Sequence, residues 1–135
     1  MTVLVVEPDM APYEREINGL HEMQQVVGGT ITAIYPFEEP VAVVCNDEAL
    51  LLNMPFNRSM EGGYGGVFGP FFVCGLGEED FCSLTSEQVQ TYKERFRHAE
   101  ILLGIYGNEP VTMKVQPKTK DKPDSPQKAA KPPER

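Results

Sequence analysis

The sequence predicts a single small α+β domain with a mostly antiparallel sheet, about two helices and a disordered C-terminal tail. Three observations lead to this fold class. Short β-branched runs are bounded by proline and glycine, two segments repeat apolar residues at helical spacing, and the last part of the chain has almost nothing to bury. A chain of 135 residues can build one core but not two ordinary domains. We therefore expect a compact domain over residues 1–110 and a tail over 111–135.

The strands are expected where apolar and β-branched residues cluster between turn formers. A segment of alternating character at 12–17 is interpreted as a further extended piece. The segment 47–58 stays open between a helical turn and a turn followed by a short strand, and Pro55 argues against a continuous helix there. The strand-like runs are "TVLVVEP" (2–8), "TITAIYPF" (30–37), "PVAVVCND" (40–47) and "GPFFVCGLG" (69–77).

A first helix is expected near residues 18–27. Asn18 is a suitable N-cap, and Leu20, Met23 and Val27 repeat at helical spacing. The glycine pair that begins at Gly28 supplies a left-handed stop.

A second helix is expected from Thr85 to Gly104. Thr85 and Gln88 form the pattern of a capping box, and Glu94 and Arg97 are spaced for a surface ion pair. One face of this helix would carry apolar residues at Val89, Tyr92, Phe96, Ala99 and Leu103.

The charge is strongly uneven. Residues 1–110 carry 17 acidic and 5 basic side chains, whereas residues 111–135 are basic and the whole chain has a net charge of −8. Direct nucleic-acid binding is not expected, because it depends on Lys and Arg neutralising phosphates. An acidic body suits a partner with a basic surface, although acidity also serves ordinary solubility.

The cysteine count and the hydropathy predict a cytoplasmic protein. The chain has three cysteines and no CxxC pair. This pattern predicts reduced thiols that pack as small apolar residues, rather than disulfides or zinc ligands. No run of 18 apolar residues is present and no secretory leader is recognisable, so no membrane association is expected.

Catalytic and cofactor motifs are not recognisable. His21 and His98 fall in separate expected helices, away from any nucleophile motif, and the acidic runs lack the alternation of a calcium loop. The glycine-rich stretch "NRSMEGGYGGVFGPFF" (57–72) has no lysine and leads into a strand, whereas a phosphate loop opens a helix. We interpret it as a hairpin or loop between strands, and expect no enzyme, metal or cofactor.

Two groups of residues are candidate binding sites. Glu78, Glu79 and Asp80 form an acidic run with Phe81 beside it, a combination that suits a partner interface. Acidic residues there also favour the helix N-terminus that follows, and both roles are compatible.

The second group surrounds the glycine-rich stretch. Arg58 is one of two basic residues before Lys93, so it is either an internal salt-bridge hub or a clamp for phosphate. In the second case Asn57 and Arg58 would hold the phosphate of a small nucleotide, and Tyr64 or Phe68 would cover its base.

Several ordered phrases carry a resemblance to a known family. "MTVLVVEP", "VGGTITAIYPFEEPVAVVCNDE", "MPFNR" and "GPFFVCGLGEEDFCSLT" resemble a domain-of-unknown-function family. Its small proteins are encoded by phages and by conjugative and integrative elements of gut Firmicutes. The resemblance covers roughly residues 1–100 and supplies no catalytic residues.

The resemblance implies a genetic context. Such elements carry accessory genes that blunt host defences. Taken with the charge, it leads us to expect a non-catalytic acidic protein of the bacterial cytoplasm that binds and inhibits a host defence protein, such as a nuclease with a basic surface. The alternatives are a small-ligand binder that sequesters a signalling nucleotide and a regulatory factor of the element.

Overall fold

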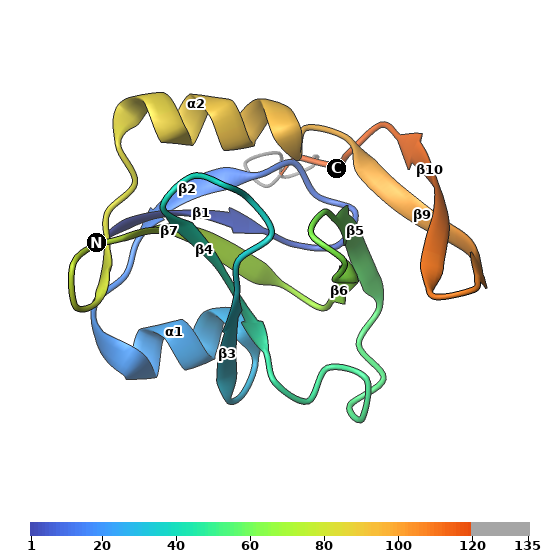
Figure 1. Cartoon of the computed structure of the whole chain (residues 1–135), viewed down its shortest axis with the longest axis horizontal. Coiled ribbons are helices and arrows are strands. Elements are labelled where there is room, and N and C mark those ends of the chain that lie inside the picture. Colours follow the sequence, from blue (N-terminus) through green and yellow to red (C-terminus); the bar gives the residue numbers. More distant parts are fainter. Residues whose placement is uncertain (120–135) are drawn as a thin grey trace, which may run out of the picture.

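Strand β7 (Phe71–Leu76) lies inside a six-stranded sheet in which every pairing is antiparallel. The computed structural model describes residues 1–119. Five strands follow the order β2-β1-β7-β4-β3, and the short strand β8 pairs with the end of β7 (Figure 1). The other strands of this sheet are β1 (Thr2–Val6), β2 (Tyr13–Glu16), β3 (Ile31–Ile34), β4 (Val41–Asn46) and β8 (Phe81–Cys82).

Two apolar cores lie on the two faces of this sheet. Because successive strand residues point to opposite faces, Leu4 and Val6 pack with helix α2 (Ser86–Arg95), whereas Val3 and Val5 pack with helix α1 (Gly19–Val27). The helices cover opposite faces of the sheet, as Figure 1 shows. The predicted α+β class with a mostly antiparallel sheet and two helices is confirmed.

Helix α1 confirms the first helical prediction. Asn18 adopts the extended N-cap backbone, yet its side chain makes no cap hydrogen bond; its N–H instead donates to Glu22 Oε1 at 2.7 Å. Gly28 ends the helix in the left-handed conformation, with φ of +81°. Val27 is buried as the apolar stripe predicts, but Leu20 is 56% exposed.

Helix α2 begins as predicted and ends earlier. Thr85 and Gln88 form the reciprocal capping box, at 3.1 and 2.9 Å. The helix stops at Arg95, and the expected helical continuation to Gly104 is wrong, because residues 99–106 form strand β9 (Ala99–Tyr106). The predicted pair of Arg97 with Glu94 is present at 3.3 Å.

Strand β10 (Glu109–Val115) pairs with β9 and corrects the start of the tail. Val111 was expected to begin a structureless segment, but residues 111–115 complete this hairpin because they pair along β9. After the hairpin the chain returns to the body, where Ala11 N–H donates to Lys118 O at 2.7 Å and Lys118 N–H donates to Asp9 O at 2.8 Å. The remainder of the expected tail, residues 120–135, lies outside the described residues.

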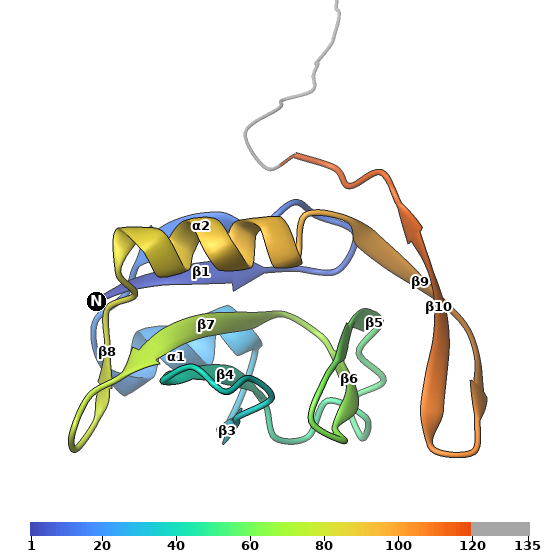
Figure 2. The same cartoon turned by 45° about the horizontal axis from the view of Figure 1, so that its top comes forward.

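Strands β5 (Phe56–Met60) and β6 (Gly65–Phe68) form a second hairpin from the glycine-rich stretch, as predicted. The open segment before it resolves into turns over 47–53, followed by β5. In Figure 2 the β9–β10 hairpin stands along one end of the molecule with β5 and β6 on its inner side. The tip of the longer hairpin comes close to Gly65, since a Cβ there would lie 3.6 Å from Asn108 O.

None of the helices within residues 1–119 has the length and apolar character needed to cross a bilayer.

Candidate functional site

The acidic loop (residues 77–80) is the turn between β7 and β8. Glu78, Glu79 and Asp80 are all exposed there. Asp80 closes the turn from both sides: its carbonyl accepts from Gly77 N–H at 2.8 Å, and its Oδ1 accepts from Phe81 N–H at 2.7 Å. The turn is therefore held in shape by Asp80, which leaves two glutamates at its tip.

Phe81 connects the acidic loop to an apolar depression. Its ring is half-buried against the core on the α1 side of the sheet. Beside it lies a depression of about 430 Å³, which we call the N-terminal hollow. Its lining comes from Met1, Ile17, Leu20, Met23, Ile31, Asp80 and Phe81, together with Asn18 and Gly19 at the start of helix α1. The four residues predicted as a partner site thus lie together, with a mixed apolar and acidic surface next to them.

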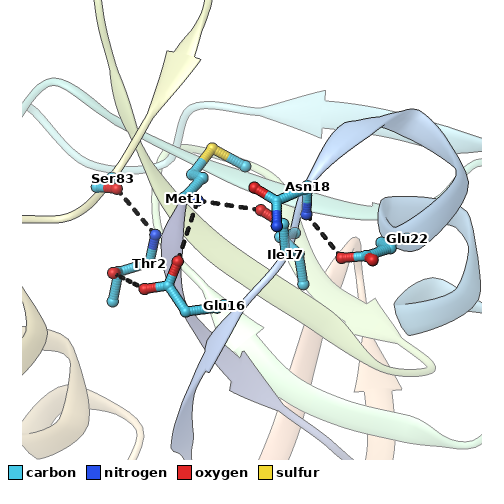
Figure 3. Close-up of polar contacts among 7 residues, drawn as sticks. All are labelled: Met1, Thr2, Glu16, Ile17, Asn18, Glu22 and Ser83. Carbon is cyan, nitrogen blue, oxygen red and sulfur yellow. Dashed lines mark hydrogen bonds and ion pairs between the residues drawn. The ribbon is translucent and has the colours of Figure 1, made fainter.

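A polar network fixes the backbone under the hollow (Figure 3). The Met1 ammonium donates to Glu16 Oε1 at 3.2 Å and to Ile17 O at 3.1 Å, and the Thr2 hydroxyl donates to the other Glu16 oxygen. Thr2 N–H donates to Ser83 Oγ at 2.8 Å, which ties β1 to the segment after the acidic loop. The Thr2 hydrogen bond, followed by that of the ammonium, lowers the pKa of Glu16 and keeps its carboxylate charged.

Asn57 and Arg58 lie inside the protein rather than on a binding surface. Both side chains are fully buried. Arg58 Nη2 donates to Met10 O at 2.7 Å and to Phe96 O at 3.0 Å, while Asn57 Nδ2 donates to Val6 O and Gly69 O, both at 2.9 Å. Arg58 thus acts as an internal hub, although the atoms it binds are main-chain carbonyls and an amide rather than the expected carboxylates.

Burial lowers the pKa of Arg58 to about 10, partly offset by the charges of Glu100 and Asp9. Glu100 is itself buried, and its Oε1 accepts from Ser59 N–H at 3.0 Å. A carboxylate within the same buried region limits the cost of enclosing the guanidinium. This placement favours a structural role for Arg58 over a phosphate clamp.

Tyr64 and Phe68 do face a depression, which we call the groove. It has a volume of about 440 Å³ and separates the turns at 47–51 from the two hairpins. Tyr64 is 43% exposed, and its hydroxyl accepts from Tyr35 N–H at 3.3 Å. Phe68 packs edge-on against Phe56, with the two ring centroids 5.3 Å apart. The apolar lining of the groove is Ile34, Leu50, Leu51, Phe56, Tyr64, Phe68, Leu102 and Ile105, and Asp47 and Glu48 add carboxylates.

The four residues predicted to bind a nucleotide therefore do not form one site. Tyr64 and Phe68 line the groove, whereas Asn57 and Arg58 are sealed in the core and do not reach it. Among the described residues that line the groove, none is Lys or Arg. The sequence reasoning did not identify Leu50, Leu51 and Leu52, which are 52–81% exposed; three successive leucines in a turn-prone segment were the signal.

Within residues 1–119, no group of three or more His, Cys, Asp or Glu side chains is arranged to hold a metal ion. Burial raises the pKa of Cys45 to about 11 and that of Cys74 to about 12, which keeps these thiols protonated and unreactive.

Comparison with known proteins gives one match. No curated protein and no solved structure matches the chain. A domain of unknown function, DUF3846, matches residues 1–97, from strand β1 through the end of helix α2 and the two residues that follow it. The matched part includes the acidic loop, the N-terminal hollow and the buried Asn57–Arg58 pair, and it stops before the β9–β10 hairpin. Because the match spans most of the sequence, the chain belongs to the DUF3846 family.

Proposed function

We propose that this protein is a non-catalytic accessory protein of a phage or mobile element that binds and inhibits a host defence protein in the bacterial cytoplasm. The partner carries a basic surface, such as the nucleic-acid-binding face of a nuclease. One observation carries the proposal: the exposed acidic loop lies directly beside the half-buried Phe81 and the N-terminal hollow.

This arrangement suits protein recognition more than solubility alone. Interfaces combine an apolar anchor region with a charged rim, and the charges guide association and select the partner. Here Glu78 and Glu79 supply the rim, and the hollow beside Phe81 can accept an apolar side chain. The acidic body adds long-range attraction for a basic partner and repels nucleic acid.

The decisive experiment compares two charge reversals. Glu78→Lys/Glu79→Lys changes the acidic loop but leaves Asp80 to close the turn. Asp47→Lys/Glu48→Lys alters two adjacent exposed acids at the groove and shifts the net charge by the same amount. Each variant would be used to capture proteins from host lysate, and the nuclease retained by the wild type would then be titrated with each variant.

The expected result is stoichiometric inhibition by the wild type and by the groove variant, with loss of binding and inhibition in the loop variant. Binding should weaken as salt rises, because exposed charges are screened beyond about 8–10 Å. Equal inhibition by both variants, or capture that salt leaves unchanged, would count against the acidic loop. Circular dichroism of both variants verifies that they are folded.

The groove supports a second candidate function, the binding of a small ligand. Tyr64, Phe56 and Phe68 offer aromatic surfaces, but the nearby charges are the carboxylates of Asp47 and Glu48. Such a lining favours an apolar or cationic ligand over the phosphate of a signalling nucleotide. Mass spectrometry of material released from purified protein on denaturation tests this candidate: a stoichiometric nucleotide or other small molecule supports it, and its absence removes it.

A further inference from the structure

The β9–β10 hairpin presents apolar side chains on the face that is turned away from the rest of the molecule. Leu102, Ile105 and Pro110 line the groove on its inner side. A second set takes no part in the groove and is 40–71% exposed. We call this set the outer face; it consists of Ile101, Leu103, Tyr106, Val111 and Met113.

A β-bulge explains how both faces of one hairpin are apolar. The register shifts between Val111 and Thr112, so β9 has one more residue than β10 in this region. Leu102 and Ile105 are three residues apart and would point to opposite faces of a regular strand, yet both line the groove. The extra residue reverses the alternation. It also places the Tyr106 ring 3.3 Å from the point where a Cβ of Gly104 would stand, so the ring lies back along the hairpin.

We propose that the outer face is a self-association surface that takes the same face of a second copy of this chain. The area is the first argument. The five side chains expose on the order of 500 Å², which is at the upper end of what a monomer normally shows in one patch. Two such faces would bury about 1,000 Å² together, the lower limit for a specific interface.

Charge is the second argument for a second copy. The chain has a net charge of −8, so two copies repel each other over most of their surface. Along the hairpin, the exposed charges within residues 99–115 are Glu109 and Lys114, which cancel. This is consequently a region where two copies of an acidic protein can meet without accumulating like charge.

The two charges lie on different faces of the hairpin. Glu109 pairs with Tyr106 of the outer face, whereas Lys114 pairs with the buried Glu100 and belongs to the opposite face. In an isologous pair the strands run in opposite directions, so the two Glu109 carboxylates lie at opposite ends of the contact and do not meet. Pro110 has no N–H to offer an edge ladder, which favours packing through the face over lengthening of the sheet.

The wild-type test is sedimentation velocity of the full chain over about two decades of concentration, with a dimer of micromolar affinity expected. Hydrogen exchange at the lowest and highest concentrations locates the surface, and slowing is expected at amides of residues 99–115. A monomer at every concentration, or slowing confined to another part of the chain, would overturn the proposal.

Variants then test the outer face. Ile101→Lys/Met113→Glu keeps an attractive cross-strand pair within the hairpin but puts charges into the dimer contact, so the dimer should be lost. Tyr35→Lys/Leu52→Glu is the matched control at exposed apolar positions outside the outer face and should dimerise like the wild type. Unchanged dimerisation of the first variant would rule out the outer face.

Discussion

Asn57 and Arg58 are adjacent residues of one strand, yet Arg58 Nη1 donates a 2.8 Å hydrogen bond to Asn57 Oδ1 and both side chains are fully buried. Neighbours on a regular strand point to opposite faces. Here the register of β5 against β6 shifts between Phe56 and Arg58, and this irregularity brings the two side chains to the same interior. Through them β5 is fixed to carbonyls of Val6, Met10, Gly69 and Phe96.

The hub predicts that Arg58 cannot be replaced. Arg58→Met should lower the free energy of unfolding by about 3 kcal/mol or more, because Asn57 Oδ1 and the carbonyls of Met10 and Phe96 all lose their donor. Arg58→Lys should also destabilise strongly, since one ammonium cannot reproduce the planar, multidentate geometry. Urea unfolding followed by circular dichroism measures both. Arg97→Met, in an exposed ion pair, should cost less than about 1 kcal/mol; a similar cost at position 58 would show that the hub contributes little.

Two glycines of the glycine-rich stretch should respond differently to alanine. Gly63 and Gly69 have nearly equal φ values of +84° and +80°, so the backbone strain is matched at about 1 kcal/mol. A Cβ at Gly63 meets open space, whereas one at Gly69 would lie 2.5 Å from Met54 Sδ and 3.2 Å from Met54 Cβ. Gly69→Ala should therefore cost a further 1–3 kcal/mol. Equal melting temperatures of the two variants would contradict the close packing at Gly69.

The lowered pKa of Glu16 predicts a pH-dependent contribution to stability. A carboxylate with a depressed folded pKa stabilises the protein above its unfolded pKa, near 4.5, and loses that contribution as pH falls through the folded value. Glu16→Gln should thus melt below the wild type at pH 7, with a difference that shrinks in strongly acidic solution. Thermal unfolding from neutral to acidic pH measures it. Thr2→Val should reproduce part of the effect, and a difference that stayed constant with pH would argue against the network.

The hydrogen bond from the Tyr92 hydroxyl to Glu39 Oε1, 2.5 Å long, predicts the opposite dependence. Burial, followed by the Glu39 hydrogen bond, raises the pKa of Tyr92 well above its ordinary value. The neutral phenol is the stabilised form, so the contribution is complete below pH 10 and is lost as pH rises through the folded value.

Tyr92→Phe keeps the ring contact with Phe37 and should cost about 1–2 kcal/mol at pH 8, and less at alkaline pH. Urea titrations at the two pH values test this expectation. Tyr35→Phe, at a half-exposed ring, is the control and should remain within about 0.5 kcal/mol of the wild type. A Tyr92→Phe protein as stable as this control would show that the Glu39 bond is not favourable.

The sheet and the starts of both helices were predictable because local signals agree with the fold. The end of helix α2 was not. Phe96 and Ala99 continue a helical stripe, and both are buried in the structure, so the pattern is consistent with either outcome. The helix has no glycine or proline at its end; instead the Phe96 carbonyl accepts from Arg58, 38 positions earlier. A terminus fixed by a distant side chain leaves no local trace.

The acidic loop was predictable as a unit because its residues are consecutive. The position of Arg58 was not, because its partners are mainly backbone carbonyls, which every residue carries. Scarcity of basic residues drew attention to Arg58 without indicating which way it faces. The groove was missed for a related reason: its walls come from turns and two hairpins far apart in sequence.

Residues 9–11 anchor both ends of the segment that carries the β9–β10 hairpin. Met10 O accepts from Arg58, which also holds Phe96 O, and the neighbouring Asp9 and Ala11 hold Lys118. The segment from Phe96 to Lys118 thus begins and ends at the same place, beside residues 9–11. A segment whose ends are fixed together in this way can be given a new sequence between Ile101 and Val115, while the parent scaffold is kept together with the buried Ala99 and Glu100.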